Sequence, residues 1–329
     1  MLPVALRPLF LFAASLCAAA TALTLSGCAP GLSAPTTRAA FSGDLTLRPA
    51  GSPDVLLLAV SGRCPTSCKA PEDNIDYLTP RGTVQAVQNT LEAQGLSVAS
   101  YAVASNLDRH TVQRVVQAQI GAGRTVPADQ NGFLQLEDRL NTAYADWMRG
   151  RSNPTRIVLL AHSHGVVWTH ALTRAHPEVP ISAMIDLDGV CDFWEMDNRR
   201  FIQAHLARVG RNPWGFNLAD SCGSVRVGNL RYDLKDVVYP NVQADLEVQS
   251  VHLLGGGGSV IANAPYDGLQ NIRTDGTRQG VQTYRSESET HSAVSSPNGK
   301  ALAWVKARLT ELSADWKPAP PPVPALPQP

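Results

Sequence analysis

Short apolar segments alternate along this chain with longer segments of mixed polarity. Residues 55–60 and 157–161 contain only apolar side chains, as expected of strands buried on both faces. Residues 83–94 instead repeat apolar side chains at helical spacing. The same patterns predict further strands at residues 96–103, 181–187, 248–254 and 281–285, and helices at residues 108–148 (broken at 121–127), 166–175 and 301–312. This alternation predicts an α/β fold, with a mostly parallel central sheet and helices on both faces.

One long segment interrupts the alternation. Residues 191–245 follow a predicted strand and are too long for a simple connection. They also carry several large aromatic side chains, namely Phe193, Trp194, Phe201, Trp214 and Phe216. We therefore expect a small cap, inserted into one large domain that spans residues 41–316.

The start of the chain is not expected to belong to this domain. Residues 9–25 carry no charge, follow a single basic side chain and end in small residues, as a secretory signal does. The segment Leu25-Ser26-Gly27-Cys28 then resembles the lipobox of bacterial lipoproteins. The resemblance implies a signal peptide at residues 1–27, a linker at residues 28–40, and an exported protein of the cell envelope that is lipid-anchored to a membrane through Cys28. The alternatives are a membrane-spanning helix and an ordinary cleavage site with a chance cysteine.

Charge and composition limit the classes of partner. Lys plus Arg and Asp plus Glu both number 28, so nothing indicates nucleic-acid binding. Residues 317–329 are rich in proline and are expected to form an extended, disordered tail.

Four cysteines lie beyond the predicted lipidation site. An even number in an exported chain favours two disulfides. We expect the pairs Cys64–Cys68 and Cys191–Cys222, since each of them brackets one loop. A zinc site is the rival interpretation, but the chain lacks the second short Cys or His pair that such a site needs.

The most informative local pattern surrounds Ser163. The apolar strand at residues 157–161 runs into His162-Ser163-His164-Gly165, and a predicted helix follows at once. This arrangement resembles the nucleophile elbow G-x-S-x-G of α/β-hydrolases, with Ala161 in place of the first glycine. The resemblance implies a strained turn that exposes the Ser163 hydroxyl and points the backbone amide of His164 at an oxyanion. The two flanking histidines point in different directions in such a turn, which argues against a metal pair.

A serine nucleophile needs a base, and the α/β-hydrolase order along the chain is serine, acid, histidine. His291 lies between the last predicted strand and the last predicted helix, where the family places its catalytic histidine. His252 is the other candidate in the last third of the chain. It stands inside an apolar run and is expected to be a strand residue.

Three aspartates are candidates for the acid that orients the base. Asp267 is preferred, because it follows the strand predicted at residues 248–254, where the family usually places its acid. Asp275, also followed by glycine, is an alternative with the same chemistry. Asp188 is a further alternative, since some lipases take the acid from the end of the preceding strand. An Asp-Gly pair is also a common turn, so the choice stays open.

The second oxyanion donor is expected in the loop after the strand at residues 55–60. Gly62 allows a close backbone approach there, and the amide of Gly62 or of Arg63 is the candidate donor. The histidine that the family often has in this loop is absent. The glycine run at residues 255–258 lacks the lysine of a phosphate-binding loop and is expected to be a loop near the site.

The resemblance as a whole implies a serine hydrolase that cleaves a carboxylic ester or a lipid-like acyl substrate through an acyl-enzyme. It implies no metal and no organic cofactor. A peptidase or amidase on the same fold, and a non-catalytic binding lipoprotein of the envelope, are the alternatives, since a fold does not fix a function.

Overall fold

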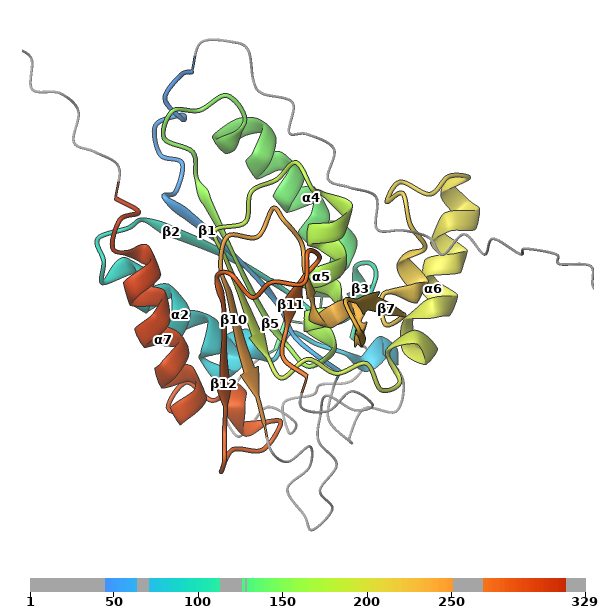
Figure 1. The fold of residues 1–329 in the computed structure, drawn as a ribbon. Helices are drawn as coiled ribbons and strands as arrows, with labels where there is room; N and C mark the ends of the chain where they lie inside the picture. The colour runs from blue at the N-terminus through green and yellow to red at the C-terminus, as the bar shows by residue number, and fades with distance from the viewer. Residues whose placement is uncertain (1–44, 64–70, 113–125, 128, 251–268, 318–329) are drawn as a thin grey trace, which may run out of the picture. The chain divides into compact units, whose positions relative to one another are not determined.

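The computed structural model describes residues 45–63, 71–112, 126–127, 129–250 and 269–317. A sheet of six parallel strands forms the centre of this region (Figure 1). The strands lie in the order β12-β10-β6-β5-β1-β2. Their bounds are Val55–Val60 for β1, Val98–Val103 for β2, Arg156–His162 for β5, Ala183–Leu187 for β6, Asp245–Gln249 for β10 and Val281–Arg285 for β12.

Helices cover both faces of this sheet (Figure 1). Helices α2 (Thr83–Glu92) and α7 (Lys300–Ser313) pack on one face. Helices α4 (Phe133–Ala143) and α5 (His164–Ala175) pack on the other. The predicted α/β fold, with a mostly parallel sheet between two helical layers, is confirmed.

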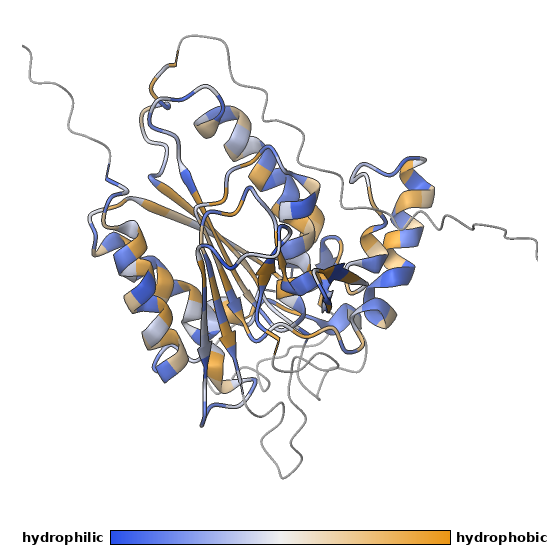
Figure 2. Ribbon diagram, viewed as in Figure 1, coloured by the Kyte–Doolittle hydropathy of each residue, from blue (hydrophilic) through white to orange (hydrophobic). Residues whose placement is uncertain are grey.

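Strand β1 is buried on both of its faces and carries only apolar side chains. Leu56, Leu58 and Val60 join the hydrophobic cluster under α4 and α5, and the intervening residues join the cluster under α2 and α7. Each residue of this strand is at most 2% exposed. Figure 2 shows the same distribution along the sheet, with apolar residues in the strands and polar residues on the outer sides of the helices.

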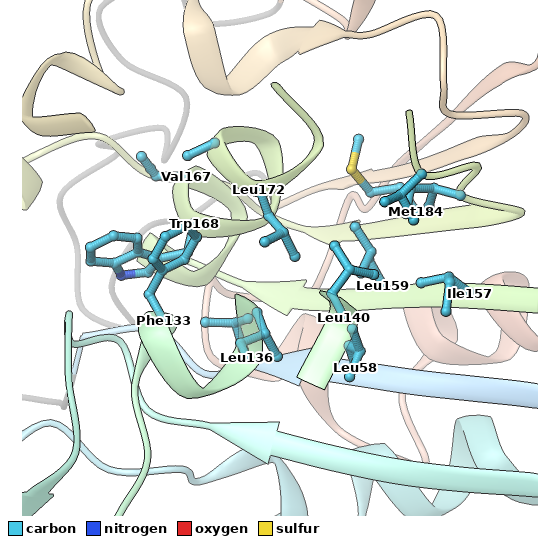
Figure 3. Close-up of a cluster of buried hydrophobic side chains, with 14 of the residues drawn as sticks. Leu58, Phe133, Leu136, Leu140, Ile157, Leu159, Val167, Trp168, Leu172 and Met184 are labelled. Carbon is cyan, nitrogen blue, oxygen red and sulfur yellow. The ribbon is translucent and has the colours of Figure 1, made fainter. Parts of the chain in front are cut away.

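The cluster under α4 and α5 is built around Trp168 (Figure 3). The indole of Trp168 stacks on Phe133 of α4, with 4.8 Å between ring centroids. It also meets the ring of Trp194, from the segment after β6, edge to face at 5.0 Å. The same cluster therefore anchors that later segment to the sheet.

The segment between β6 and β10, called the insertion below, adds no strand to the central sheet. It begins with α6 and continues through short elements: α6 Trp194–Val209, η3 Leu218–Asp220, β7 Ser224–Val227, β8 Leu230–Asp233, η4 Leu234–Asp236 and β9 Val237–Val238. The disulfide Cys191–Cys222 ties its start to the turn before β7, as expected. The other expected pair, Cys64–Cys68, lies outside the described residues. Trp194 and Trp214 are buried in the core instead of lining a free surface.

The remaining elements are short. They are η1 Pro71–Asp73, α1 Leu78–Arg81, β3 His110–Thr111, β4 Asp129–Gln130, the π-helical turn η2 Tyr144–Met148, β11 Ile272–Arg273 and η5 Ala293–Ser295. Within the described ranges, no helix is both long and apolar enough to cross a membrane. The predicted signal, linker and lipidation site precede these ranges, and the proline-rich tail follows them.

Two predicted elements differ from the structure. The helix predicted from residue 108 is wrong at residues 110–111, which form β3 and pair with β4. Residues 113–125 of this prediction lie outside the described residues, and α4 begins at Phe133. The strand predicted at residues 248–254 begins earlier, at Asp245, because Asp245 and Glu247 are buried in the sheet despite their charge. His252, expected to be a strand residue, lies outside the described residues.

Packing of α4 on the sheet gives a stability prediction. Leu140 is fully buried, so Leu140→Ala should lower the free energy of unfolding by about 2–5 kcal/mol through lost burial and a residual cavity. Leu230 on β8 is 51% exposed, and Leu230→Ala should change the free energy of unfolding by less than about 0.5 kcal/mol. Chemical denaturation of both variants measures the difference. Equal effects would contradict the packing described here.

Candidate active site

Ser163 stands in a strained turn between β5 and α5. Its backbone has φ 58° and ψ −129°, a conformation that residues other than glycine rarely adopt. It follows His162, the last residue of β5, and precedes His164, the first residue of α5. The sharp turn from buried strand to helix that the sequence predicted is therefore present.

The turn exists only because two neighbouring positions lack a side chain. A Cβ on Gly165 would lie 2.2 Å from the backbone oxygen of Val60. A Cβ on Gly62 would lie 2.3 Å from the Cβ of Ser163. Both distances are shorter than any real contact, so the loop after β1 and the turn after β5 can touch only through glycine.

The strand register brings Asp188 beside Ser163. In the parallel pair β5–β6, His162 lies opposite Leu187, so Ser163 and Asp188 are the next residue on each strand. The amide of Ser163 donates to the backbone oxygen of Leu187 at 3.1 Å. Asp188, like Ser163, has a positive φ, of 54°.

His291 joins the two residues into one hydrogen-bonded chain. Its Nδ1 lies 2.7 Å from Oδ2 of Asp188, and its Nε2 lies 2.9 Å from Oγ of Ser163. A carboxylate only accepts, so Nδ1 carries the proton and Nε2 accepts from the serine hydroxyl. Ser163 and Asp188 are almost completely buried.

Asp188 is held by a residue that the sequence analysis did not single out. Ser250, directly after β10, donates its amide to Oδ1 of Asp188 at 2.8 Å and its hydroxyl to Oδ2 at 2.5 Å. Asp275, an alternative acid, is exposed and accepts instead from the amide and hydroxyl of Thr277. Asp267, the preferred acid, lies outside the described residues. Of the two candidates within the described residues, Asp188 is the one that the structure brings to His291.

The loop after β1 contacts the turn of Ser163, as expected. The amide of Gly62 already donates to the hydroxyl of Tyr77 at 2.9 Å. Of the two candidate donors in this loop, Arg63 is therefore the one whose amide has no acceptor among the described residues. The amide of His164 is the first of α5, where an N–H has no partner within the helix.

The side chain of Arg63 links this loop to the inserted segment. Its Nε lies 2.8 Å from Oδ2 of the buried Asp197 on α6, and its guanidinium covers the ring of Phe193 at 5.2 Å. The imidazole of His164 is buried beneath them and donates from Nε2 to the backbone oxygen of Asp192 at 2.6 Å. The insertion is thus in direct contact with the turn that carries Ser163.

Two further side chains surround the site without having been predicted to do so. Tyr77 and His162 are both buried, and the Tyr77 hydroxyl is hydrogen-bonded to Nδ1 of His162. Nε2 of His162 lies 2.7 Å from the backbone oxygen of His291. No signal in the sequence marks Tyr77, because its role depends on a contact across two loops.

The order of the parallel strands, together with a serine elbow between a central strand and a helix, defines the α/β-hydrolase fold. No protein-family model matches this chain, and no curated protein matches its sequence.

Several solved structures are similar. The esterase domain of a Rhodothermus marinus protein is 15% identical over 82% of this chain and 90% of that chain, with a TM-score of 0.39. Est1E from Butyrivibrio proteoclasticus with bound ferulic acid is 14% identical over 80% and 90%, with a TM-score of 0.34. A hormone-sensitive lipase from a metagenome library is 14% identical over 83% and 84%, with a TM-score of 0.37. These values are too low to transfer an activity to this chain.

The buried histidine at position 164 predicts a pH dependence of stability. Burial lowers the pKa of His164 to about 4, against an unfolded value of roughly 6.5. Between these values the unfolded chain binds a proton that the folded chain does not. The free energy of unfolding therefore falls with decreasing pH across this window, by up to roughly 1.4 kcal/mol per pH unit from this group.

The variant His164→Gln tests this dependence, because glutamine keeps a donor for Asp192 but does not titrate. Its unfolding free energy, measured by denaturant between pH 7 and pH 4.5, should decline less steeply than that of the native chain. Parallel declines would show that His164 is not the group responsible.

Proposed function

We propose that this chain is a serine hydrolase that cleaves carboxylic esters through an acyl-enzyme. The hydrogen-bonded chain from Ser163 through His291 to Asp188 is the observation that carries the proposal. A serine hydroxyl is a weak nucleophile by itself and needs an adjacent base that is oriented by a third group.

The first half of the reaction forms the acyl-enzyme. Oγ of Ser163 attacks the ester carbonyl carbon while Nε2 of His291 takes its proton. Asp188 holds the imidazole in the required tautomer and stabilises the imidazolium that forms. His291 then gives the proton to the alcohol oxygen as the carbon–oxygen bond breaks, and the alcohol leaves.

The negative charge on the carbonyl oxygen needs fixed donors in the transition state. The backbone amides of His164 and Arg63 are the proposed pair, one at the start of α5 and one in the loop that touches Ser163 through Gly62. The positive end of the α5 dipole adds to their effect. One such donor typically contributes roughly 3–4 kcal/mol to lowering the barrier.

Water completes the cycle by the same route. His291 takes a proton from a water molecule as its oxygen attacks the acyl carbon, and returns that proton to Oγ of Ser163 as the acid is released. The serine and the histidine end in their starting protonation states, so one ester and one water yield one acid and one alcohol.

The proposed ester substrate carries an apolar acyl or aryl group. Phe193 and Met196 are 58% and 70% exposed at the start of the insertion, which is unusual for large apolar side chains. Both line a surface groove of about 950 Å³, whose other lining residues are mostly polar and include Glu195, Arg199 and Asp233. Phe193 contacts Arg63, so this groove adjoins the proposed oxyanion loop.

Export and lipid attachment at Cys28 are a separate proposal, which rests on the signal-like sequence. The disulfide Cys191–Cys222 supports it, since such bonds persist mainly in oxidising compartments. The full chain expressed in a bacterium should fractionate with membranes, and Cys28→Ser should move it to the soluble fraction. An unchanged distribution would argue against the lipid anchor.

Steady-state hydrolysis of p-nitrophenyl butyrate, with the matching anilide as an amide comparison, tests the catalytic proposal. Ser163→Ala should lower kcat by roughly 10³–10⁶-fold. Asp188→Asn should lower it by roughly 10²–10⁴-fold, because the neutral amide no longer fixes the histidine tautomer.

Asp275→Asn and Asp267→Asn are the matched controls, and both should leave kcat within about threefold of the native value. Full turnover by Ser163→Ala would overturn the proposal. Loss of activity in Asp267→Asn but not in Asp188→Asn would instead assign the acid to Asp267.

A further inference from the structure

Four groups around Ser163 form a second hydrogen-bonded chain that the proposed reaction does not use directly. The amide of Gly62 lies 2.9 Å from the Tyr77 hydroxyl, and this hydroxyl contacts Nδ1 of His162. Nε2 of His162 lies 2.7 Å from the backbone oxygen of His291. Tyr77 is 5% exposed and His162 is 3% exposed, so water does not compete for these bonds.

The direction of every bond in this chain is fixed by its ends. The Gly62 amide can only donate, so the Tyr77 oxygen accepts from it and donates its own proton onward. The backbone oxygen of His291 can only accept, so Nε2 of His162 carries a proton. A neutral imidazole then has its lone pair on Nδ1, where the Tyr77 hydroxyl donates.

The imidazole of His162 is kept in this neutral form by its surroundings. Burial lowers the pKa of His162 well below that of a free histidine, and the nearby His291 imidazole and Arg81 guanidinium lower it further, although the hydrogen bond to the His291 backbone oxygen acts in the opposite direction. An imidazolium would carry protons on both nitrogens and would turn Nδ1 from an acceptor into a donor facing the Tyr77 hydroxyl.

The chain joins three separate parts of the site. Gly62 belongs to the oxyanion loop, His162 ends the strand that leads to Ser163, and His291 is the proposed base. The ring centroids of His162 and His291 lie 4.6 Å apart, with an angle of 32° between the rings, so the two imidazoles are neighbours.

The segment around α1 fixes Tyr77 in turn. Oγ of Ser61 accepts from the amides of Tyr77 at 3.0 Å and Leu78 at 3.1 Å. The guanidinium of Arg81 covers the Tyr77 ring at 5.1 Å and donates to the backbone oxygen of Ser292 at 2.9 Å. Tyr77 is therefore attached on one side to the oxyanion loop and on the other to the histidine loop.

We propose that Tyr77 and His162 are positioning residues, which fix the oxyanion loop and the backbone of His291 relative to Ser163 through this hydrogen-bonded chain. The inference rests on the proposed function, since it concerns how the same site is aligned. Neither residue touches the reacting atoms. Displacement of catalytic groups by about 1 Å can cost roughly 10²-fold in rate, so loss of this alignment should appear in kcat.

Kinetics of Tyr77→Phe give the first test, with Tyr232→Phe as the matched control. Tyr232 is equally buried, but it lies on β8 outside the chain of bonds. Tyr77→Phe should lower kcat by roughly 10–100-fold and leave KM within about threefold, because the lost bond aligns groups that act in the transition state. Tyr232→Phe should keep the native kcat. Equal kcat values for the two variants would overturn the inference.

Two substitutions of His162 separate the halves of the chain. His162→Gln keeps a donor for the His291 oxygen but removes the acceptor of Tyr77, whereas His162→Asn keeps the acceptor and loses the donor. If the chain acts as a unit, the double variant Tyr77→Phe/His162→Gln should be no slower than His162→Gln alone within about twofold. If the effects of Tyr77→Phe and His162→Gln on kcat multiply in the double variant, the two residues do not act through a shared chain. Native kcat in both His162 variants would also contradict the inference.

Ser163→Ala in the same assay keeps this test distinct from that of the proposed function. If hydrolysis persists in Ser163→Ala, the proposed function is wrong. If Ser163→Ala abolishes hydrolysis but Tyr77→Phe keeps the native rate, only the proposed positioning role is wrong. Denaturant unfolding of each variant, compared with the native chain, identifies any loss of rate that comes from unfolding. If Tyr77→Phe does not fold, the two His162 variants decide.

Discussion

The backbone contact between the ends of β1 and β5 is the constraint on which the rest of the site depends. A side chain at Gly165 would strike the Val60 carbonyl, and a side chain at Gly62 would strike Ser163. The two strand ends can therefore meet only where both positions are glycine. This contact places the loop after β1 against the serine. The buried sheet around it holds Ser163 at a positive φ, a conformation that costs roughly 1–3 kcal/mol. The register of β5 with β6 then places Asp188 next to Ser163.

The parts that the sequence predicts well are those determined by local pattern. The uniformly apolar runs at β1 and β5 give their strands, since a strand between two helical layers has no polar face. The tight glycine and the following helix mark Ser163, because strain at the elbow restricts its neighbours to small residues. His291 could be located from its place between the last strand and the last helix, which the structure reproduces.

The parts that the sequence does not determine depend on contacts between distant segments. Asp188, Asp267 and Asp275 are each followed by glycine, so local pattern does not separate them. Asp188 reaches His291 because it follows β6, the neighbour of β5 in the sheet. The sequence predicts β10 too late along the chain, because the acidic side chains at its start are buried and hydrogen-bonded inside the protein. Asn271 donates to Oδ2 of Asp245 at 2.9 Å and to Oε2 of Glu247 at 3.0 Å, bonds that no local pattern reveals. Burial raises the pKa of Glu247 to about 7, so this carboxyl group can be neutral inside the sheet.

Reaction of the purified protein with a fluorophosphonate, followed by mass spectrometry of its peptides, tests whether Ser163 is an activated nucleophile. An activated serine oxygen attacks the phosphorus of this reagent and releases fluoride, so the product reports the Ser163–His291–Asp188 chain without knowledge of the natural substrate. We expect one adduct, on Ser163, which forms far more slowly in Asp188→Asn. A folded protein that acquires no adduct on Ser163, or that is labelled on another serine instead, would contradict it.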